Sequence, residues 1–173
     1  MTKEEVLRFI TSRRSIRNFT SEPVSEEDIM IILKSAMAAP SARNVQPWSF
    51  IVVKERKTLD RLAEVHPYGK MLAEAPLAIA VAGDPAKSDY WAQDCSAATQ
   101  NILLSARGLG LGSVWLGVHP KPDRVKAVRE TLGIPEHIQI LSLIPVGHPA
   151  KNIDPRTQYD EAKVHREKWQ VKS

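Results

Sequence analysis

Residues 89–109 read "DYWAQDCSAATQNILLSARGL" and predict a long helix with apolar side chains on several faces. Small side chains along a seam let another element approach closely, and apolar residues on several faces indicate burial on several sides. Two interpretations stay open: a core helix of a monomer, or a helix that also packs on a partner subunit. We favour the partner, because a small domain can hardly bury such a helix all round. The residues at four-three spacing are Trp91, Cys95, Ala98, Ile102, Ser105 and Leu109.

The segments around this helix predict short strands and amphipathic helices in alternation. Thr2 and Glu5 match a capping box that begins the first helix, which should end near Ser12. Alternating helices and short apolar strands indicate an α/β or α+β layered fold. Further helices are predicted from Ser25 to Pro40, at 57–65 and at 121–133, and strands at 49–53, 77–82, 113–118 and 138–147.

Composition limits the class of protein. The 173 residues favour one domain, 1–173, and the net charge of +4 is too small to indicate a general nucleic-acid binder. A single cysteine, Cys95, excludes an intramolecular disulfide and a cysteine-rich zinc site. The N-terminal stretch is charged from Lys3 and lacks an apolar signal core, and no apolar run is long enough to span a membrane. We therefore expect a globular, cytoplasmic protein with no membrane and no nucleic-acid partner.

Several common kinds of site lack sequence support. The chain has no GxxxxGK[ST] loop, and the glycines at 108, 110 and 112 do not fit GxGxxG. The five histidines have no metal-like spacing, and the serines have no histidine at a recognisable motif distance, so neither a metal site nor a hydrolase triad is predicted. Asp84, Asp89 and Asp94 are interpreted as solvated or capping carboxylates.

An arginine cluster follows the first helix. Arg13, Arg14 and Arg17 surround Ser15 within five positions, "RRSIR". The planar guanidinium forms two charge-assisted hydrogen bonds to phosphate and stays ionised, and the serine hydroxyl adds a donor. The cluster predicts a phosphate site, although a solvated basic edge at a helix end explains it as well.

Two further stretches carry candidate binding residues. The loop "APSARNVQPWSF" (39–50) is stiffened by prolines and offers Asn44 and Gln46, whose amides suit the donors and acceptors of a heterocycle edge. The alternative is a capped turn in which Asn44 bonds its own backbone. In "GLGLGSVWLGV" (108–118), Gly117 lets another group approach the backbone, unless it marks a bulge.

These stretches together closely resemble the FMN-dependent nitroreductase family. Its R-[RH]-S-x-[RK]-x-F segment is matched at residues 13–19, and its P-S-x-x-N-x-Q-P-W segment is matched in full at 40–48. G-L-G-x-x-W is matched at 110–115, and P-x-G-[YH]-P-A at 145–150. The matches extend over almost the whole chain, and the segment with fixed Asn and Gln is the specific one.

The resemblance implies both a fold and a site. The fold would be of the α+β class, with three αβα layers and a mixed, mostly antiparallel sheet flanked by helices. The molecule would be an intertwined homodimer whose tail, 150–173, packs on the partner subunit. FMN would bind at the interface, with Arg13, Arg14, Ser15 and Arg17 of one subunit on its phosphate, ribityl chain and pyrimidine edge. The residues implied near the flavin ring are Pro40, Ser41, Ala42 and Asn44 from the other subunit, and Leu116 and Gly117, whose backbone would lie near the flavin N5. Gln46 is a further candidate for binding the cofactor.

The tail departs from the family pattern at one position. The family often has a basic-x-Arg pair there that reaches the phosphate. Here the stretch reads Arg156-Thr157-Gln158, so Arg156 is kept as a candidate while Gln158 cannot carry the charge.

The activity that the resemblance implies is an oxidoreductase that passes electrons from NAD(P)H to electron-poor small molecules such as nitroaromatics and quinones, in a ping-pong sequence. No side chain acts as nucleophile, because the flavin carries the chemistry. A reductive dehalogenase-like enzyme of the same fold and a non-catalytic flavin-binding redox protein are the alternatives. A weak nucleic-acid binder is a third, supported by basicity alone.

Overall fold

A computed structural model describes residues 1–151 and 153–169 of the chain. Its centre is a sheet in the order β1-β2-β5-β3, with β4 also paired to β5. All of these strand pairs are antiparallel, while an isolated parallel bridge joins Ser15 to Ser113. The predicted mixed, mostly antiparallel sheet is therefore confirmed. The strands are β1 (Trp48–Val53), β2 (Leu77–Gly83), β3 (Gly112–Ser113), β4 (Leu116–Gly117) and β5 (Gln139–Gly147).

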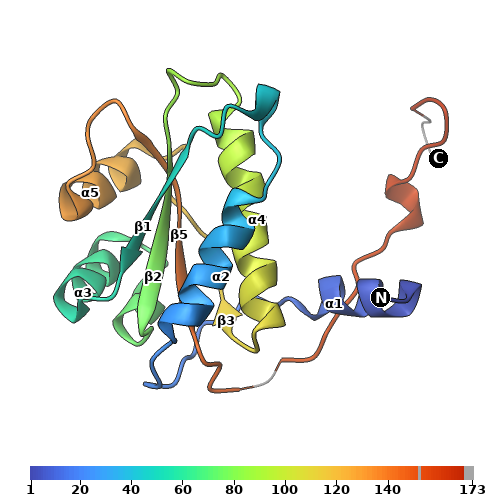
Figure 1. Ribbon diagram of the computed structural model, residues 1–173, viewed down its shortest axis with the longest axis horizontal. Helices are drawn as coiled ribbons and strands as arrows, with labels where there is room; N and C mark the ends of the chain where they lie inside the picture. Colours follow the sequence, from blue (N-terminus) through green and yellow to red (C-terminus); the bar gives the residue numbers. More distant parts are fainter. Residues whose placement is uncertain (152, 170–173) are drawn as a thin grey trace.

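Helices cover both faces of the sheet and make three layers (Figure 1). α2 (Glu26–Met37) and α4 (Trp91–Gly108) pack together on one face. α3 (Arg56–Val65) and α5 (Pro122–Leu132) cover the other face. The α+β, three-layer fold is the one expected from the sequence.

Strand β2 shows why the sheet needs both helical layers. Leu77, Ile79 and Val81 pack on the side of α2 and α4. Ala78 and Ala80, the alternate residues, pack on the side of α3 and α5. Successive side chains of a strand point to opposite faces, so a strand with no polar position is buried on both.

The helix boundaries follow local capping chemistry. Thr2 accepts a hydrogen bond from Glu5 N–H and Glu5 accepts one from Thr2 N–H, which completes the predicted capping box. Ser25 accepts from Asp28 N–H (3.0 Å) at the start of α2. Gly133 ends α5 in the left-handed conformation, with φ 63°.

The predicted strand 113–118 is instead two short strands, β3 and β4. The register of both with β5 is continuous, which places Val114 opposite Pro145. Proline has no N–H, so the ladder loses a bond between the two strands. The prediction of one unbroken strand was wrong for this reason.

An arm stands away from the layered body. It consists of residues 1–12, which include α1 (Lys3–Ser12), and residues 153–169; the tail passes α1 at residues 155–157 and then extends away from it (Figure 1). Val6 and Ile10 of α1 are 44% and 47% exposed. Amphipathicity was predicted correctly: Phe9 is half-buried beside Gly108 of α4, whereas Val6 and Ile10 remain largely exposed.

The described residues contain neither a membrane-spanning helix nor a cluster of metal-ligating side chains. None of the helices there is long and apolar enough to cross a bilayer. Within residues 1–151 and 153–169, no three His, Cys, Asp or Glu side chains gather in a way that suits a metal ion.

Candidate functional site

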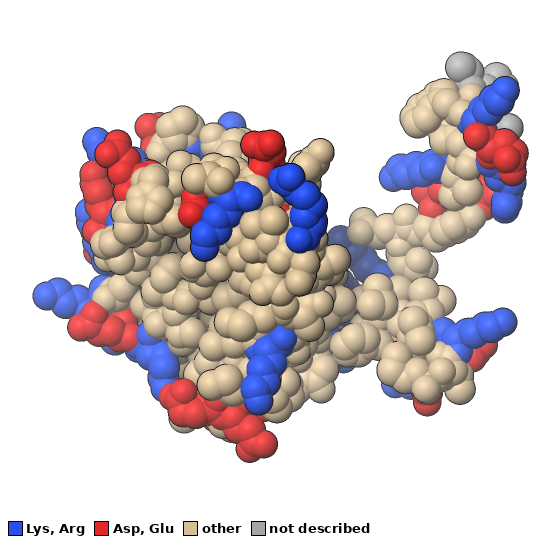
Figure 2. Space-filling model, turned by 45° about the horizontal axis from the view of Figure 1, so that its top comes forward, with Lys and Arg blue, Asp and Glu red and all other residues tan. Residues whose placement is uncertain are grey.

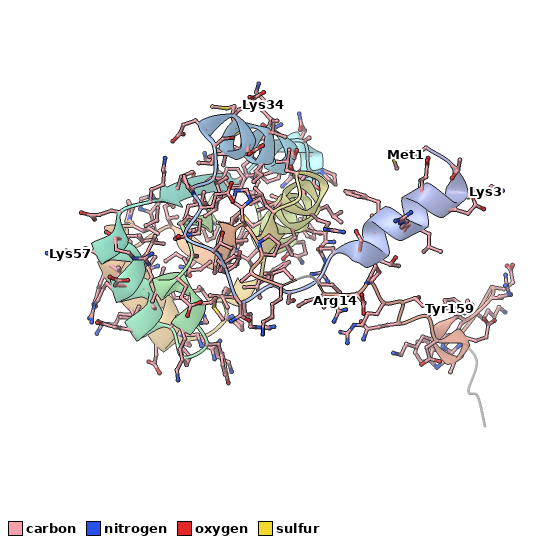
Figure 3. All side chains as sticks on the ribbon, turned by 90° about the horizontal axis from the view of Figure 1, so that it is seen from below. Met1, Lys3, Arg14, Lys34, Lys57 and Tyr159 are labelled. Carbon is pink, nitrogen blue, oxygen red and sulfur yellow. The ribbon has the colours of Figure 1, made fainter. Side chains whose placement is uncertain are left out.

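A basic pocket of about 480 Å³ lies where the arm joins the body. Figure 2 shows basic side chains in this recess, and Figure 3 places Arg14 at the base of the arm. The residues lining the pocket include no Asp or Glu among those that the structure describes. Such an uncompensated group of guanidinium donors fits a phosphate dianion. The lining residues are Ile10, Thr11, Arg13, Arg14, Ser15, Arg17, Arg156, Thr157 and Gln158.

Backbone bonds bring the two parts of this pocket together. Ile16 N–H donates to Ser113 O (3.0 Å), which ties the arginine segment to β3. Arg14 donates to the carbonyl of Asp154, and Arg156 N–H lies 3.4 Å from Thr11 O. The tail residue Arg156 therefore sits beside the N-terminal cluster, although they are far apart in sequence.

The loop before β1 forms a pre-organised turn around the short helix η1 (Ala42–Asn44). Gln46 N–H donates to Ser41 Oγ (3.0 Å), and Gln46 Nε2 donates to Asn44 Oδ1 (3.0 Å). Asn44 and Gln46 have positive φ angles of 57° and 52°, as does Arg43 at 52°. Non-glycine residues in this conformation are uncommon and gather at functional sites. Pro40 is exposed and lies three residues after the end of α2.

A residue that sequence reasoning missed holds this loop in place. Asp94, 6% exposed, accepts hydrogen bonds from Ala42 N–H (3.0 Å) and from Ser88 Oγ (3.2 Å). Of the two interpretations, solvated or capping, the solvated one was wrong: Asp94 is buried and accepts from Ala42 N–H at the start of η1. Asp94 lies three residues after Trp91 and four before Ala98, so it is on the same buried side of α4. This spacing could have been read from the sequence.

The third candidate stretch presents backbone at the sheet edge. Leu116 is buried in the core beside α3 and α5. Gly117 is half-buried, and a Cβ built on it would meet nothing within 4 Å. The pairs of β4 with β5, Leu116 with Leu143 and Gly117 with Ser142, show no register shift, so Gly117 does not mark a bulge. The register shift of β5 lies in its pairing with β2, at Val81/Ala82. The glycine leaves open space above the backbone.

A second missed residue, His66, touches this glycine. His66 is 2% exposed and its Nε2 lies 3.1 Å from Gly117 O. Burial lowers the pKa of His66, and the charge of Arg124 lowers this pKa further, which outweighs the opposing effect of the bond to Gly117. By contrast the single thiol, Cys95, has its pKa raised to about 12 by burial and by Asp94, so it is not a candidate nucleophile.

The arginine pocket and the loop 40–46 lie at opposite ends of α4. Arg107 Nε donates to Ser12 Oγ (2.9 Å) at the C-terminal end, while Asp94 holds Ala42 near the N-terminal end. These two ends are about 20 Å apart at 1.5 Å of rise per residue. One chain therefore anchors the two groups of candidate residues at opposite ends of α4.

Comparison with known proteins finds the same family that the sequence motifs resemble. A family profile described as "Nitroreductase family" matches residues 10–66 and 63–148. A protein of Archaeoglobus fulgidus, provisionally named NADH dehydrogenase/NAD(P)H nitroreductase, is 51% identical over 173 residues, which cover 96% of this chain and 99% of that protein. The solved FMN-dependent nitroreductase of Clostridium difficile R20291 is 33% identical with a TM-score of 0.90, covering 94% of this chain and 99% of that one. Iodotyrosine deiodinase of Thermotoga neapolitana is more distant, 27% identical over 88% of this chain and 91% of its own.

Proposed function

This chain belongs to the nitroreductase family, and from that premise we propose that it is an FMN-dependent oxidoreductase that uses NAD(P)H to reduce small electron-poor molecules such as nitroaromatics and quinones. One observation carries the proposal. Arg13, Arg14, Arg17 and Arg156 converge on one pocket that has no acidic residue in its described lining.

The pocket fits the phosphate of FMN in charge and in donor type. Like charges held together are costly in a folded chain, and a phosphate dianion neutralises them. Ser15 adds a hydroxyl, and Arg156 takes the place of the tail cation while Gln158 lines the pocket without charge. We therefore assign these five residues, four arginines and Ser15, to the phosphate and ribityl side of the cofactor.

The loop 40–46 and β4 are assigned to the flavin ring. Ser41, Ala42, Asn44 and Gln46 belong to a turn whose backbone is fixed by internal bonds and by Asp94. Because this turn lies about 20 Å from the arginine pocket of its own chain, it serves the pocket of a second copy. Leu116 and Gly117 supply backbone at the sheet edge.

When bound, FMN supplies the redox chemistry by accepting two electrons from NAD(P)H and giving them to the acceptor. The protein binds and orients the cofactor and leaves its open face to each substrate in turn. The acceptor and NAD(P)H are thus proposed to share one site, in a ping-pong sequence. The whole chain, 1–173, acts as one FMN-binding domain in this proposal.

A test of this function starts with the purified protein and its absorption spectrum. We expect an FMN spectrum, oxidation of NADH or NADPH with a quinone such as menadione, and parallel lines in double-reciprocal plots. Bound FMN without turnover would favour the non-catalytic redox protein. Faster turnover with a halogenated tyrosine than with nitroaromatics or quinones would favour the dehalogenase. Intersecting lines would contradict the shared site.

The arm predicts a homodimer. The exposed apolar residues of α1 include Leu7 at 62%, and Ile153 of the tail is 43% exposed. Apolar residues gathered on a projecting segment are typical of an interface. We expect the FMN-loaded protein to sediment as a dimer at micromolar concentration. The double variant Val6→Glu, Leu7→Glu should shift it toward monomer and weaken FMN binding together, since a ligand bound only by the dimer stabilises it. Met30→Glu, at an exposed position of α2, is the matched control.

A further inference from the structure

Two side chains from different elements bind one backbone carbonyl at the candidate site. His66 Nε2 lies 3.1 Å from Gly117 O, and Arg124 Nη1 donates to the same oxygen at 3.0 Å. His66 follows α3 and Arg124 lies on α5. We call His66 and Arg124 the carbonyl clamp.

The clamp acts on the open side of β4. Val118 N–H donates to Leu141 O (3.0 Å) of β5, so this amide belongs to the sheet. Amides of neighbouring residues in an antiparallel strand point to opposite sides. The N–H and the carbonyl of Gly117 therefore both point away from β5, where the clamp binds the carbonyl.

Hydrogen bonding fixes the tautomer of His66. Tyr68 N–H donates to His66 Nδ1 (3.2 Å), which makes Nδ1 an acceptor. A carbonyl cannot donate, so Nε2 carries the proton and donates to Gly117 O. The ring is neutral in this arrangement, and the positive charge of the clamp resides on Arg124.

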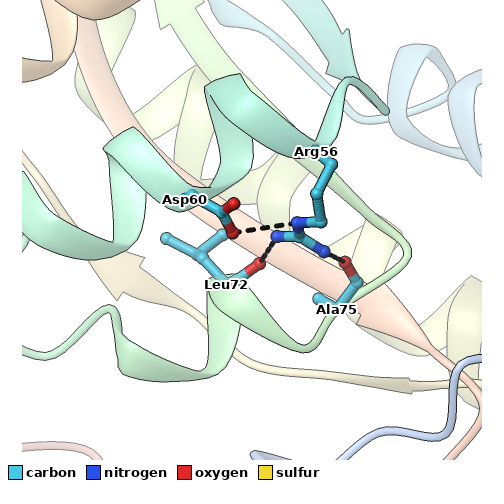
Figure 4. A network of polar contacts seen from close by, with 4 residues as sticks. All are labelled: Arg56, Asp60, Leu72 and Ala75. Carbon is cyan, nitrogen blue, oxygen red and sulfur yellow. Dashed lines mark hydrogen bonds and ion pairs between the residues drawn. The ribbon is translucent and has the colours of Figure 1, made fainter.

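Neighbouring contacts keep the clamp rigid. The Arg124 guanidinium lies over the Tyr68 ring, 5.3 Å from its centroid. The segment that carries His66 and Tyr68 continues into η2 (Lys70–Ala73), which Arg56 ties to α3 (Figure 4). Arg56 donates to Asp60 (2.9 Å), to Ala75 O (3.0 Å) and to Leu72 O.

Such an arrangement is costly unless the position of Gly117 matters. The protein buries a histidine and uses an arginine to hold one carbonyl, that of Gly117. Glycine has the greatest conformational freedom of any residue, so these two bonds restrain a backbone that would otherwise move easily. The space above Gly117 is open, so packing alone does not hold it.

We propose that His66 and Arg124 are positioning residues that fix the Gly117 backbone toward the flavin, and that Arg124 also holds a positive charge beside it. This inference rests on the proposed function, because it takes Gly117 to border FMN. A fixed cation stabilises the more negative, reduced form of the cofactor over the oxidised form.

The test measures FMN in both redox states. Arg124→Gln removes the charge but keeps an amide donor. We expect it to weaken binding of reduced FMN about tenfold while binding of oxidised FMN changes less than threefold. The midpoint potential then falls by about 15–30 mV, since a tenfold ratio in a two-electron couple equals 29.6 mV and a weaker oxidised complex reduces that ratio. Arg124→Lys should keep most of the potential, and Lys126→Ala, exposed on the same helix, is the matched control.

His66 is tested by rescue. His66→Leu should weaken binding of reduced FMN several-fold, and His66→Gln, whose amide can donate to Gly117 O, should restore it. If His66→Leu does not fold, the Arg124 pair decides. An unchanged midpoint potential in Arg124→Gln overturns the inference. So does a loss of thermal stability in the Arg124 and His66 variants that is accompanied by no change in the potential. If the inference fails but the parent protein binds FMN and oxidises NAD(P)H, the proposed function stands. If the parent protein does not bind FMN, both the proposed function and the inference are wrong.

Discussion

Replacing Arg17 with alanine is expected to weaken FMN binding roughly ten- to a hundredfold. Arg17 is exposed and lines the basic pocket, with Arg156 as the described tail cation there and Gln158 uncharged. A hydrogen bond to a charged group is worth about 1.5–3 kcal/mol, and each 1.4 kcal/mol is tenfold in affinity. Titration of the apoprotein by quenching of FMN fluorescence measures the effect. The flavin ring contacts are untouched, so cofactor-saturated Arg17→Ala should keep much of its turnover.

Two further variants make this result specific. Arg61→Ala removes an exposed arginine on α3 that is ion-paired with Glu64 (2.9 Å), and it should leave FMN affinity unchanged. Gln158→Arg adds the missing tail charge to the pocket lining and should tighten binding. If Arg17→Ala binds FMN as tightly as the parent does, the assignment of Arg17 to the phosphate is wrong.

Truncating Ile144 to alanine is expected to lower the free energy of unfolding by about 2–5 kcal/mol. Ile144 is fully buried on β5, in the core shared with α2 and α4. Its removal leaves a cavity between the sheet and these helices, which the surrounding side chains fill only in part. Urea denaturation at fixed protein and FMN concentration measures the loss, because ligand and partner concentration change apparent stability.

The matched control is Ile31→Ala, the same truncation on the outer side of α2. Ile31 is 39% exposed, so its loss should cost less than about 1 kcal/mol. Equal costs for the two variants would contradict the assignment of β5 to the core.

Local signals predicted most of the secondary structure. Thr2, Ser25 and Gly133 mark helix ends through bonds within a few residues of each cap, so the sequence alone contains the whole interaction. The division of the strand 113–118 was not predictable in this way. It depends on Pro145 lying opposite Val114, and this register is set only when the sheet assembles.

The candidate site was predicted in part for the same reason. The motifs at 13–19 and 40–48 named the arginines, Ser41, Asn44 and Gln46 directly from the sequence. Asp94 and His66 were missed because their partners, the backbones of Ala42 and Gly117, are 52 and 51 residues away. Sequence motifs and the periodicity of helices describe neighbouring positions. They do not identify a side chain that binds the backbone of a residue far away in the sequence.

The separation of the two groups of site residues along α4 has a genetic consequence in the proposed dimer. Each site would draw the arginines from one chain and the loop 40–46 from the other. At FMN concentrations too low to saturate them, a chain defective at Arg17 and a chain defective at Asn44 would each form homodimers of low activity. Their heterodimer would contain one site with both defects and one site built wholly from intact residues. Two alleles that fail alone would thus restore about half of the activity per heterodimer when expressed together, which alleles of a site confined to one chain cannot do.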